Sequence, residues 1–198
     1  MLELRRVVAM LFLFAAPALA QGPEIQKTPP PLNDHELLKK YVWTTLGPGG
    51  AIHATVTATL EEWRGSPEAW SQVEGGYARR WVSEYAASAI GSTTKYAFAR
   101  ALHQDPSFVR CNCTGWKPRL GHSLVSPFKA RTRNGKWVFS PATIAGLTAQ
   151  NVVPAATWYP EPRGVRDGVA HAASGVLSKM AVDVLREFIP PRWVKKPF

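Results

Sequence analysis

Apolar residues recur every three or four positions along most of this chain, which is the spacing of one face of a helix. The first such run follows Asn33, and Glu36 stands three residues later in the arrangement of a capping box. The glycine-rich stretch 47–50 ends this run. A second run over residues 51–63 is rich in Ala and Thr, and its β-branched residues lose rotamer freedom in a helix. The pattern predicts two consecutive helices.

Proline and glycine limit the helices predicted in the middle of the chain. Pro67 lies between a serine and an acid, which favours the start of a helix. The apolar face of that helix is predicted at Trp70, Val73, Tyr77 and Trp81. Gly75-Gly76 interrupts this face and predicts a bend or a close helix crossing. A break is predicted at Gly91, followed by a short helix over residues 93–102 that stops before Pro106.

The next segment has weaker patterns. A loop is predicted over residues 105–118 and a short helix over residues 120–130. Asn134 and Gly135 form a turn signal, and residues 137–139 are predicted to form a brief strand after it.

Two further helices are predicted toward the C-terminus. One starts at Pro141 and is kinked or ended by Pro154. The last spans residues 164–189 and has Lys179 and Asp183 paired on its polar side. Its apolar face is predicted at Val165, Val169, Ala172, Val176, Met180, Val184 and Phe188. Small residues that allow close helix packing recur at Gly164, Gly168, Ala172 and Gly175.

These elements predict an all-α fold, with a single helical domain of about six helices over residues 33–198. Residues 21–32 contain three consecutive prolines and predict a Pro-rich linker. Residues 1–20 combine two arginines, an apolar run and a terminal Ala-Leu-Ala, which is typical of a cleaved signal peptide. We therefore expect an exported protein of the periplasm or cell envelope.

The formal net charge is +10, and +9 once the leader's two Arg and one Glu are removed. Hydrophobic residues form 45% of the chain and charged residues 19%, which indicates a globular protein. Such a charge favours anionic partners. For an exported protein these are anionic lipid or a cell-wall polymer rather than nucleic acid, with peripheral association at a membrane. A basic protein kept soluble by its charge is the alternative.

Residues 110–137 contain seven basic residues, interleaved with aromatic residues and interrupted by no acid. Charge and stacking together can bind an anionic ligand. The residues predicted to do so are Arg119, Lys129, Arg131, Arg133 and Trp137. A solvated basic face without a ligand is the alternative interpretation.

Cys111 and Cys113 are separated by one residue in the predicted loop. In an oxidising compartment such a pair can form a disulfide in a tight ring, and an exposed, strained disulfide exchanges readily. A redox role and a local staple both fit this pair. His103 and His122 flank the cysteines and would complete the donor set of a zinc site, although the spacing matches no strong zinc pattern.

His103 and Asp105 lie at a predicted helix end. A histidine near a carboxylate can act as a general base, which would suit an exported hydrolase. In the structural alternative, Asp105 satisfies backbone groups of a turn and His103 interacts with the helix dipole. The sequence contains no G-x-S-x-G, P-loop or H-E-x-x-H motif, and no cofactor is predicted.

Several short motifs between Tyr77 and Ile189 belong together. They are Tyr77-Ala78-Arg79-Arg80, Gly91, Leu102-His103-Gln104-Asp105-Pro106, Asn134-Gly135, Gly146 and Trp158-Tyr159-Pro160 with Arg163 close by. In these motifs the chain resembles a family of small exported proteins frequent in Acidobacteria. That family has a basic residue and Tyr after the Asp-Pro, where this chain has Ser107-Phe108. The resemblance implies an exported, mostly helical envelope protein and brings no catalytic residue.

The sequence thus predicts an exported, non-enzymatic envelope protein with a basic, aromatic surface for anionic lipid or cell-wall material. An exported hydrolase using His103 and Asp105, or a redox or metal module at Cys111 and Cys113, are the alternatives.

Overall fold

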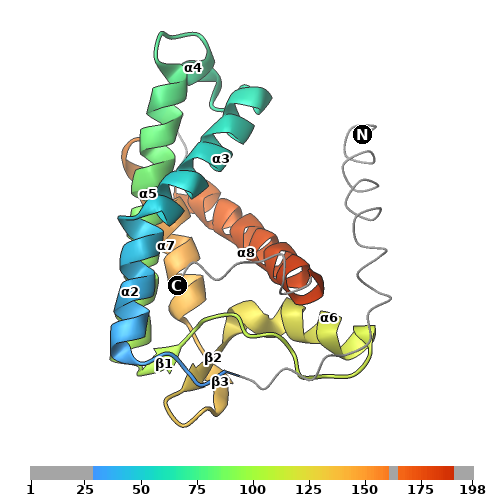
Figure 1. The fold of residues 1–198 in the computed structure, drawn as a ribbon. Coiled ribbons are helices and arrows are strands. Elements are labelled where there is room, and N and C mark those ends of the chain that lie inside the picture. The colour runs from blue at the N-terminus through green and yellow to red at the C-terminus, as the bar shows by residue number, and fades with distance from the viewer. Residues whose placement is uncertain (1–28, 161–164, 190–198) are drawn as a thin grey trace. The chain divides into compact units, whose positions relative to one another are not determined.

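The computed structural model describes residues 29–160 and 165–189, and this part of the chain is mostly helical (Figure 1). The helices are α2 (Asp34–Thr45), α3 (Pro48–Arg64), the one-turn α4 (Glu68–Ser71), α5 (Gly76–Ala101), α6 (Trp116–Val125), α7 (Ala142–Thr157) and α8 (Val165–Phe188). A small sheet contains β1 (Gln104–Asp105), β2 (Lys129–Thr132) and β3 (Trp137–Phe139) in that order. The prediction of a helical fold is confirmed, with six helices of ten or more residues among those described.

The predicted signal peptide, residues 1–20, and residues 21–28 of the predicted linker lie outside the described residues. Within the described part, the contacts divide into two compact units. The larger unit contains residues 30–107 and 128–178, and the smaller contains residues 29, 108–127 and 179–189. No helix of residues 29–160 and 165–189 has the length and apolarity that a membrane crossing requires.

The capping box predicted at Asn33 is present at the start of α2. The Asn33 side chain accepts a hydrogen bond from the Glu36 backbone N–H, and the Glu36 carboxylate accepts one from the Asn33 N–H, both at 2.9 Å. Leu37 of this helix is buried with Ala99 and Ala142 in the core of the larger unit. A local sequence signal therefore fixes where the first described helix begins.

Helix α5 is the centre of the larger unit, with α2, α3 and α7 packed along it (Figure 1). The prediction of a break at Gly91 is wrong, because α5 continues through this residue to Ala101. A Cβ on Gly91 would lie 2.9 Å from the carbonyl oxygen of Gly146 in α7, and one on Gly146 would lie 2.8 Å from the carbonyl of Gly91. Both glycines are thus places where two helix backbones approach closely, rather than breaks.

The interruption predicted at Gly75-Gly76 is confirmed, because one helix ends before it and another begins there. Helix α4 ends at Ser71, and α5 starts at Gly76 after Gly75 in the left-handed conformation, with φ of 74°. A fully buried arginine, Arg80, explains the interruption, because it requires nearby carbonyl groups that a continuous helix would use internally. Its guanidinium donates to the carbonyls of Ser66, Pro67 and Trp70, the Ser71 hydroxyl and the Glu62 carboxylate.

The helix predicted over residues 120–130 is displaced toward the N-terminus. Helix α6 occupies Trp116–Val125, a 3₁₀ turn follows at Ser126–Phe128, and residue 129 already belongs to β2. The turn at Asn134–Gly135 and the strand over residues 137–139 are confirmed. The sequence did not predict β2, because a four-residue strand with two basic residues shows no alternation of apolar and polar residues.

Helix α8 is present where it was predicted, but its predicted apolar face is wrong in part. Val165 and Val169 are 59% and 52% exposed, whereas Ala172 and the acidic residues Asp183 and Glu187 are buried. In the larger unit the reason is a close approach of α8 to α7 at Gly168, where a Cβ would lie 2.7 Å from the Cα of Val152. Small residues such as Gly168 allow the two helices to approach closely, whereas the larger Val165 and Val169 remain exposed. In the smaller unit the acids are buried because cations pair with them.

Gly91→Ala tests the contact between α5 and α7. Alanine is intrinsically the better helix former by about 1 kcal/mol, but its methyl group would collide with the α7 backbone. We expect a net loss of about 1–3 kcal/mol in the free energy of unfolding, measured in urea. The control is Gly121→Ala in α6, where a Cβ meets nothing within 4 Å and stability should rise slightly. A stabilised Gly91→Ala variant would contradict the close approach.

Glu84 gives a second prediction. Burial raises the pKa of this α5 carboxyl above its ordinary value of 4.5, and the Thr57 hydroxyl offsets this in part. The folded state therefore holds the proton more tightly than the unfolded state, so ionised Glu84 opposes folding at neutral pH. We expect Glu84→Gln to raise the unfolding free energy at neutral pH, with the gain disappearing as the pH falls below about 4.5. The exposed Glu68→Gln is the control and should show no pH-dependent gain in unfolding free energy. If Glu84→Gln stabilised the protein equally at every pH, burial of the ionised carboxyl would not be the cause.

Candidate functional site

The hairpin formed by β2 and β3, residues 129–139, carries most of the predicted ligand-binding residues; we call it the basic–aromatic hairpin. Its antiparallel register pairs Lys129 with Phe139 and Arg131 with Trp137. Directly opposed residues share a face of the sheet, and side chains alternate along each strand. Lys129, Arg131, Trp137 and Phe139 therefore lie on one face.

The aromatic residues of this face are open to solvent. Trp137 is 43% exposed and Phe139 is 68% exposed, and Lys129 is also exposed. Lys136 is exposed at the turn, next to Gly135 with its φ of 76°. This face thus presents two aromatic rings beside Lys129, and Lys136 adds a second exposed charge at the turn of the same hairpin. The sequence analysis did not select Phe139 or Lys136, although the two-residue spacing from Trp137 to Phe139 is a signal that could have identified the first.

Arg131, in contrast, is only 3% exposed, and its guanidinium donates to the Asp105 carboxylate at 2.9 Å. It lies under the indole of Trp137, with its central carbon 5.9 Å from the ring centroid. The same guanidinium donates to the Pro30 carbonyl at 3.3 Å. Arg131 therefore supports the hairpin from within, and in this conformation its charge is not offered to a ligand.

Asp105 is the buried partner of that arginine. Besides Arg131 it accepts hydrogen bonds from the backbone N–H groups of Leu32, at 3.0 Å, and Ser107, at 2.9 Å. Both carboxylate oxygens are therefore engaged in holding the N-terminal segment and the turn after β1. This arrangement matches the structural alternative for Asp105 and gives no support to a hydrolase in which it serves His103.

His103 has a different set of neighbours. It adopts a left-handed backbone conformation, φ 51°, directly after α5, and its Nδ1 lies 3.1 Å from the Arg133 guanidinium. Arg133 in turn donates to Asp34 at 2.9 Å. The Arg100 guanidinium also contacts Asp34 and, more than any other group, holds the pKa of that carboxyl below its usual value. His103, Arg133 and Asp34 line one small pocket together with Asp105 and Arg131.

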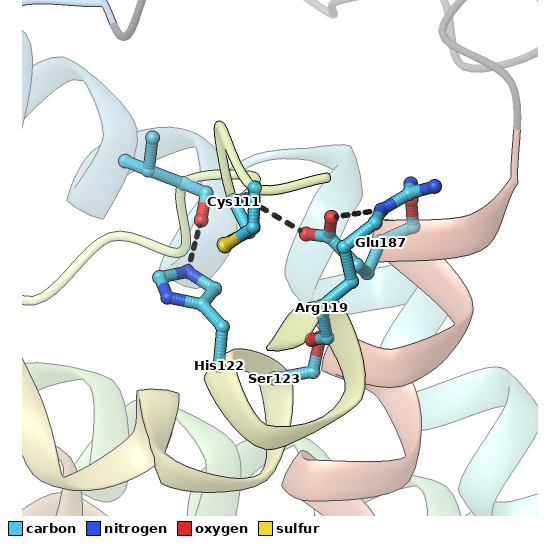
Figure 2. The surroundings of a disulfide bond; sticks show 7 residues. Cys111, Arg119, His122, Ser123 and Glu187 are labelled. Carbon is cyan, nitrogen blue, oxygen red and sulfur yellow. Dashed lines mark hydrogen bonds and ion pairs between the residues drawn. A yellow bond between two sulfur atoms is a disulfide. The ribbon is translucent and has the colours of Figure 1, made fainter. Parts of the chain in front are cut away.

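The smaller unit contains the cysteines. The Cα atoms of Cys111 and Cys113 are 5.1 Å apart, within the range for a disulfide. The Cys111 backbone N–H donates to the Glu187 carboxylate at 3.0 Å, and the other oxygen of Glu187 accepts from Arg119 Nε at 2.8 Å (Figure 2). Arg119 also donates to the backbone carbonyl of Glu187.

Glu187 is the residue that sequence reasoning missed most completely. It is fully buried, one helical turn after the equally buried Asp183, which accepts from Ser126 and Lys179. Burial lowers the pKa of Lys179, an effect that Asp183 opposes. An acid on the face of α8 that was predicted to be polar gives no sign of burial, because the cation that pairs with it lies 68 residues away.

The four residues that would bind zinc in the metal alternative are His103, Cys111, Cys113 and His122, and they do not all belong to one unit. His122 has its Nε2 2.8 Å from the Val109 carbonyl in the smaller unit, and His103 belongs to the larger unit. Across residues 29–160 and 165–189, no three His, Cys, Asp or Glu side chains are arranged to hold a metal ion. Of the five predicted ligand-binding residues, Arg119 lies in the smaller unit and the other four lie in the hairpin of the larger unit.

No family model, curated protein or solved structure is significantly similar to this chain. The resemblance to small exported proteins therefore stays a prediction.

The buried ion pair of the larger unit can be tested by stability. Arg131→Met leaves the Asp105 carboxylate buried without its cation, so we expect a loss of about 3 kcal/mol in the free energy of unfolding. Lys129→Met, two residues earlier and exposed, should change it by less than about 0.5 kcal/mol. Urea unfolding followed by circular dichroism measures both. Equal effects of the two substitutions would show that Arg131 is not a structural residue.

Proposed function

We propose that this chain is an exported, non-enzymatic envelope protein that binds the surface of an anionic membrane through its basic–aromatic hairpin. The observation that carries the proposal is the exposure of Trp137 and Phe139 beside Lys129 on one face of the hairpin. Export rests on the pattern of residues 1–20, and it predicts that the protein purified from its host begins at Gln21.

Aromatic and basic side chains act together at a membrane surface. Each Lys or Arg near an anionic leaflet contributes about 1 kcal/mol of attraction. Aromatic rings gain free energy by entering the boundary between headgroups and acyl chains. In the hairpin, Lys129 and Lys136 supply charge while Trp137 and Phe139 supply the rings. The Arg131 guanidinium under the indole helps to hold Trp137 in place.

The exposed rings favour lipid over a cell-wall polymer. A polyanionic polymer is held mainly by charge and hydrogen bonds, and such binding gains little from a phenylalanine. The side chain of Phe139 carries no polar group, and 68% of its surface faces solvent. Insertion into a membrane boundary removes that surface from water, at roughly 25 cal/mol for each Å². This supports anionic lipid as the ligand.

Co-sedimentation with lipid vesicles tests the proposal, using protein purified from its host with its native N-terminus. We expect binding to phosphatidylglycerol-containing vesicles that decreases with salt, and little binding to phosphatidylcholine alone. Trp137→Ala/Phe139→Ala and Lys129→Gln/Lys136→Gln should each weaken binding about tenfold or more, since each removes about 2 kcal/mol of attraction.

Matched controls come from exposed residues elsewhere in the larger unit. Leu60→Ala/Trp63→Ala removes two exposed apolar side chains of α3, and Arg64→Gln/Arg79→Gln removes two exposed charges. Neither should change vesicle binding by more than about twofold. If the control pairs lose as much affinity as the hairpin pairs, binding is not localised to the hairpin. Binding to a soluble polyanion but not to vesicles would instead favour the cell-wall alternative and overturn the proposal.

A further inference from the structure

We propose that Cys111 and Cys113 form a thiol–disulfide exchange site that oxidises exposed dithiols, in which Cys113 is the sulfur that substrate attacks and Cys111 is the leaving sulfur. This inference is independent of membrane binding. It rests on the export part of the proposed function, which places the pair in an oxidising compartment.

A purely structural role explains the pair poorly. The stabilisation that a disulfide gives increases with the length of the loop it closes, and residues 111–113 are the shortest such loop in which the cysteines are not adjacent. The bond would join no separate elements, since both cysteines lie in one segment between β1 and α6. Little stability is therefore gained from the pair as a staple.

The pair is accessible to another molecule. Cys111 and Cys113 are each only partly buried, and Asn112 between them is exposed, as are Thr114 and Gly115. The segment has no regular secondary structure until Trp116 begins α6. Thiol–disulfide exchange requires a thiolate to approach the bond in line with its two sulfurs, and such a segment leaves room for that approach.

The two cysteines differ in how they are held. The backbone of Cys111 is fixed by its hydrogen bond to Glu187, which is itself fully buried and paired with Arg119 (Figure 2). The Glu187 carboxylate beside Cys111 repels an incoming thiolate, so attack is favoured at Cys113 and Cys111 is the sulfur displaced. Once displaced, the more basic thiolate of Cys111 is the stronger nucleophile and is suited to resolve a mixed disulfide.

Cys113 lies three residues before the first residue of α6. The first turn of that helix contains Lys117 and no acid, and no side chain caps its N-terminal N–H groups. Cations and the N-terminus of a helix both lower the pKa of a thiol and so favour its thiolate. Of the two sulfurs, Cys113 therefore has the surroundings of the reactive one.

The reaction balances with an external disulfide as the oxidant. A thiolate of the substrate attacks Cys113 Sγ, the bond to Cys111 breaks, and Cys111 leaves as a thiolate. The second thiol of the substrate then attacks the mixed disulfide, and Cys113 leaves. The substrate has lost two electrons and two protons and gained a disulfide, and this chain holds two thiols. A small-molecule disulfide such as glutathione disulfide restores the pair by the same exchange in reverse.

Single-cysteine variants test the assignment of roles. Glutathione disulfide is added to the full protein carrying Cys111→Ser or Cys113→Ser, and formation of the mixed disulfide is followed by intact mass at neutral pH. We expect Cys113 to react about tenfold faster than Cys111. Lys117→Gln in the Cys111→Ser background should slow the reaction about threefold, whereas the exposed Arg79→Gln should leave it unchanged. Equal rates, or a faster Cys111, would overturn the assignment.

Turnover tests the activity itself. With glutathione disulfide present, the full protein should accelerate oxidation of a reduced dithiol peptide, and Cys111→Ser/Cys113→Ser should not. If the two proteins act alike, the pair is not an exchange site. A large loss of thermal stability in the double variant would show that the pair is a structural staple after all. Vesicle binding by the double variant should be unchanged, which separates failure of this inference from failure of the membrane proposal.

Discussion

The buried ion pair between Asp105 and Arg131 is the interaction on which the hairpin depends. It connects β1 to β2 by side chains as well as by the strand pairing, and Asp105 also binds the backbone at Leu32. Two charges removed from water are tolerated only when each is satisfied, so the positions of the strands and of the N-terminal segment are coupled. The strand that carries the exposed aromatic residues, β3, is therefore paired with a strand that a buried ion pair holds in place.

The same principle recurs across the described residues, because the largest fully buried side chains are charged. Arg80 fixes the connection from α3 to α5. Near the C-terminal end of α8, Glu187 binds the backbone of Cys111 and Asp183 binds the Ser126 hydroxyl. The buried apolar residues, in contrast, are mostly alanines. Small side chains bring helices together without specifying one arrangement, whereas a satisfied polar network tolerates few alternatives. In this chain the charged groups define the geometry.

These facts explain what the sequence could and could not predict. The capping box at Asn33, the turn at Asn134–Gly135 and the general helical character come from interactions within a few residues, so a local pattern reveals them. The continuity of α5 through Gly91 depends on a partner in α7, 55 positions away, and the burial of Glu187 depends on Arg119. Such pairs leave no periodic signal. The candidate hairpin was found through its charge, but which of its basic residues face water follows only from the strand register.

The contact at Gly91 and Gly146 also restricts how the length of this chain can change. In each helix one carbonyl fills the space that the other helix leaves empty. Inserting or deleting one residue within α5 or α7 would rotate everything beyond it by about 100° and turn a side chain into that space. The segments that connect the helices are not restricted in this way. Insertions and deletions during evolution are therefore expected in those segments, while the spacing around both glycines stays constant.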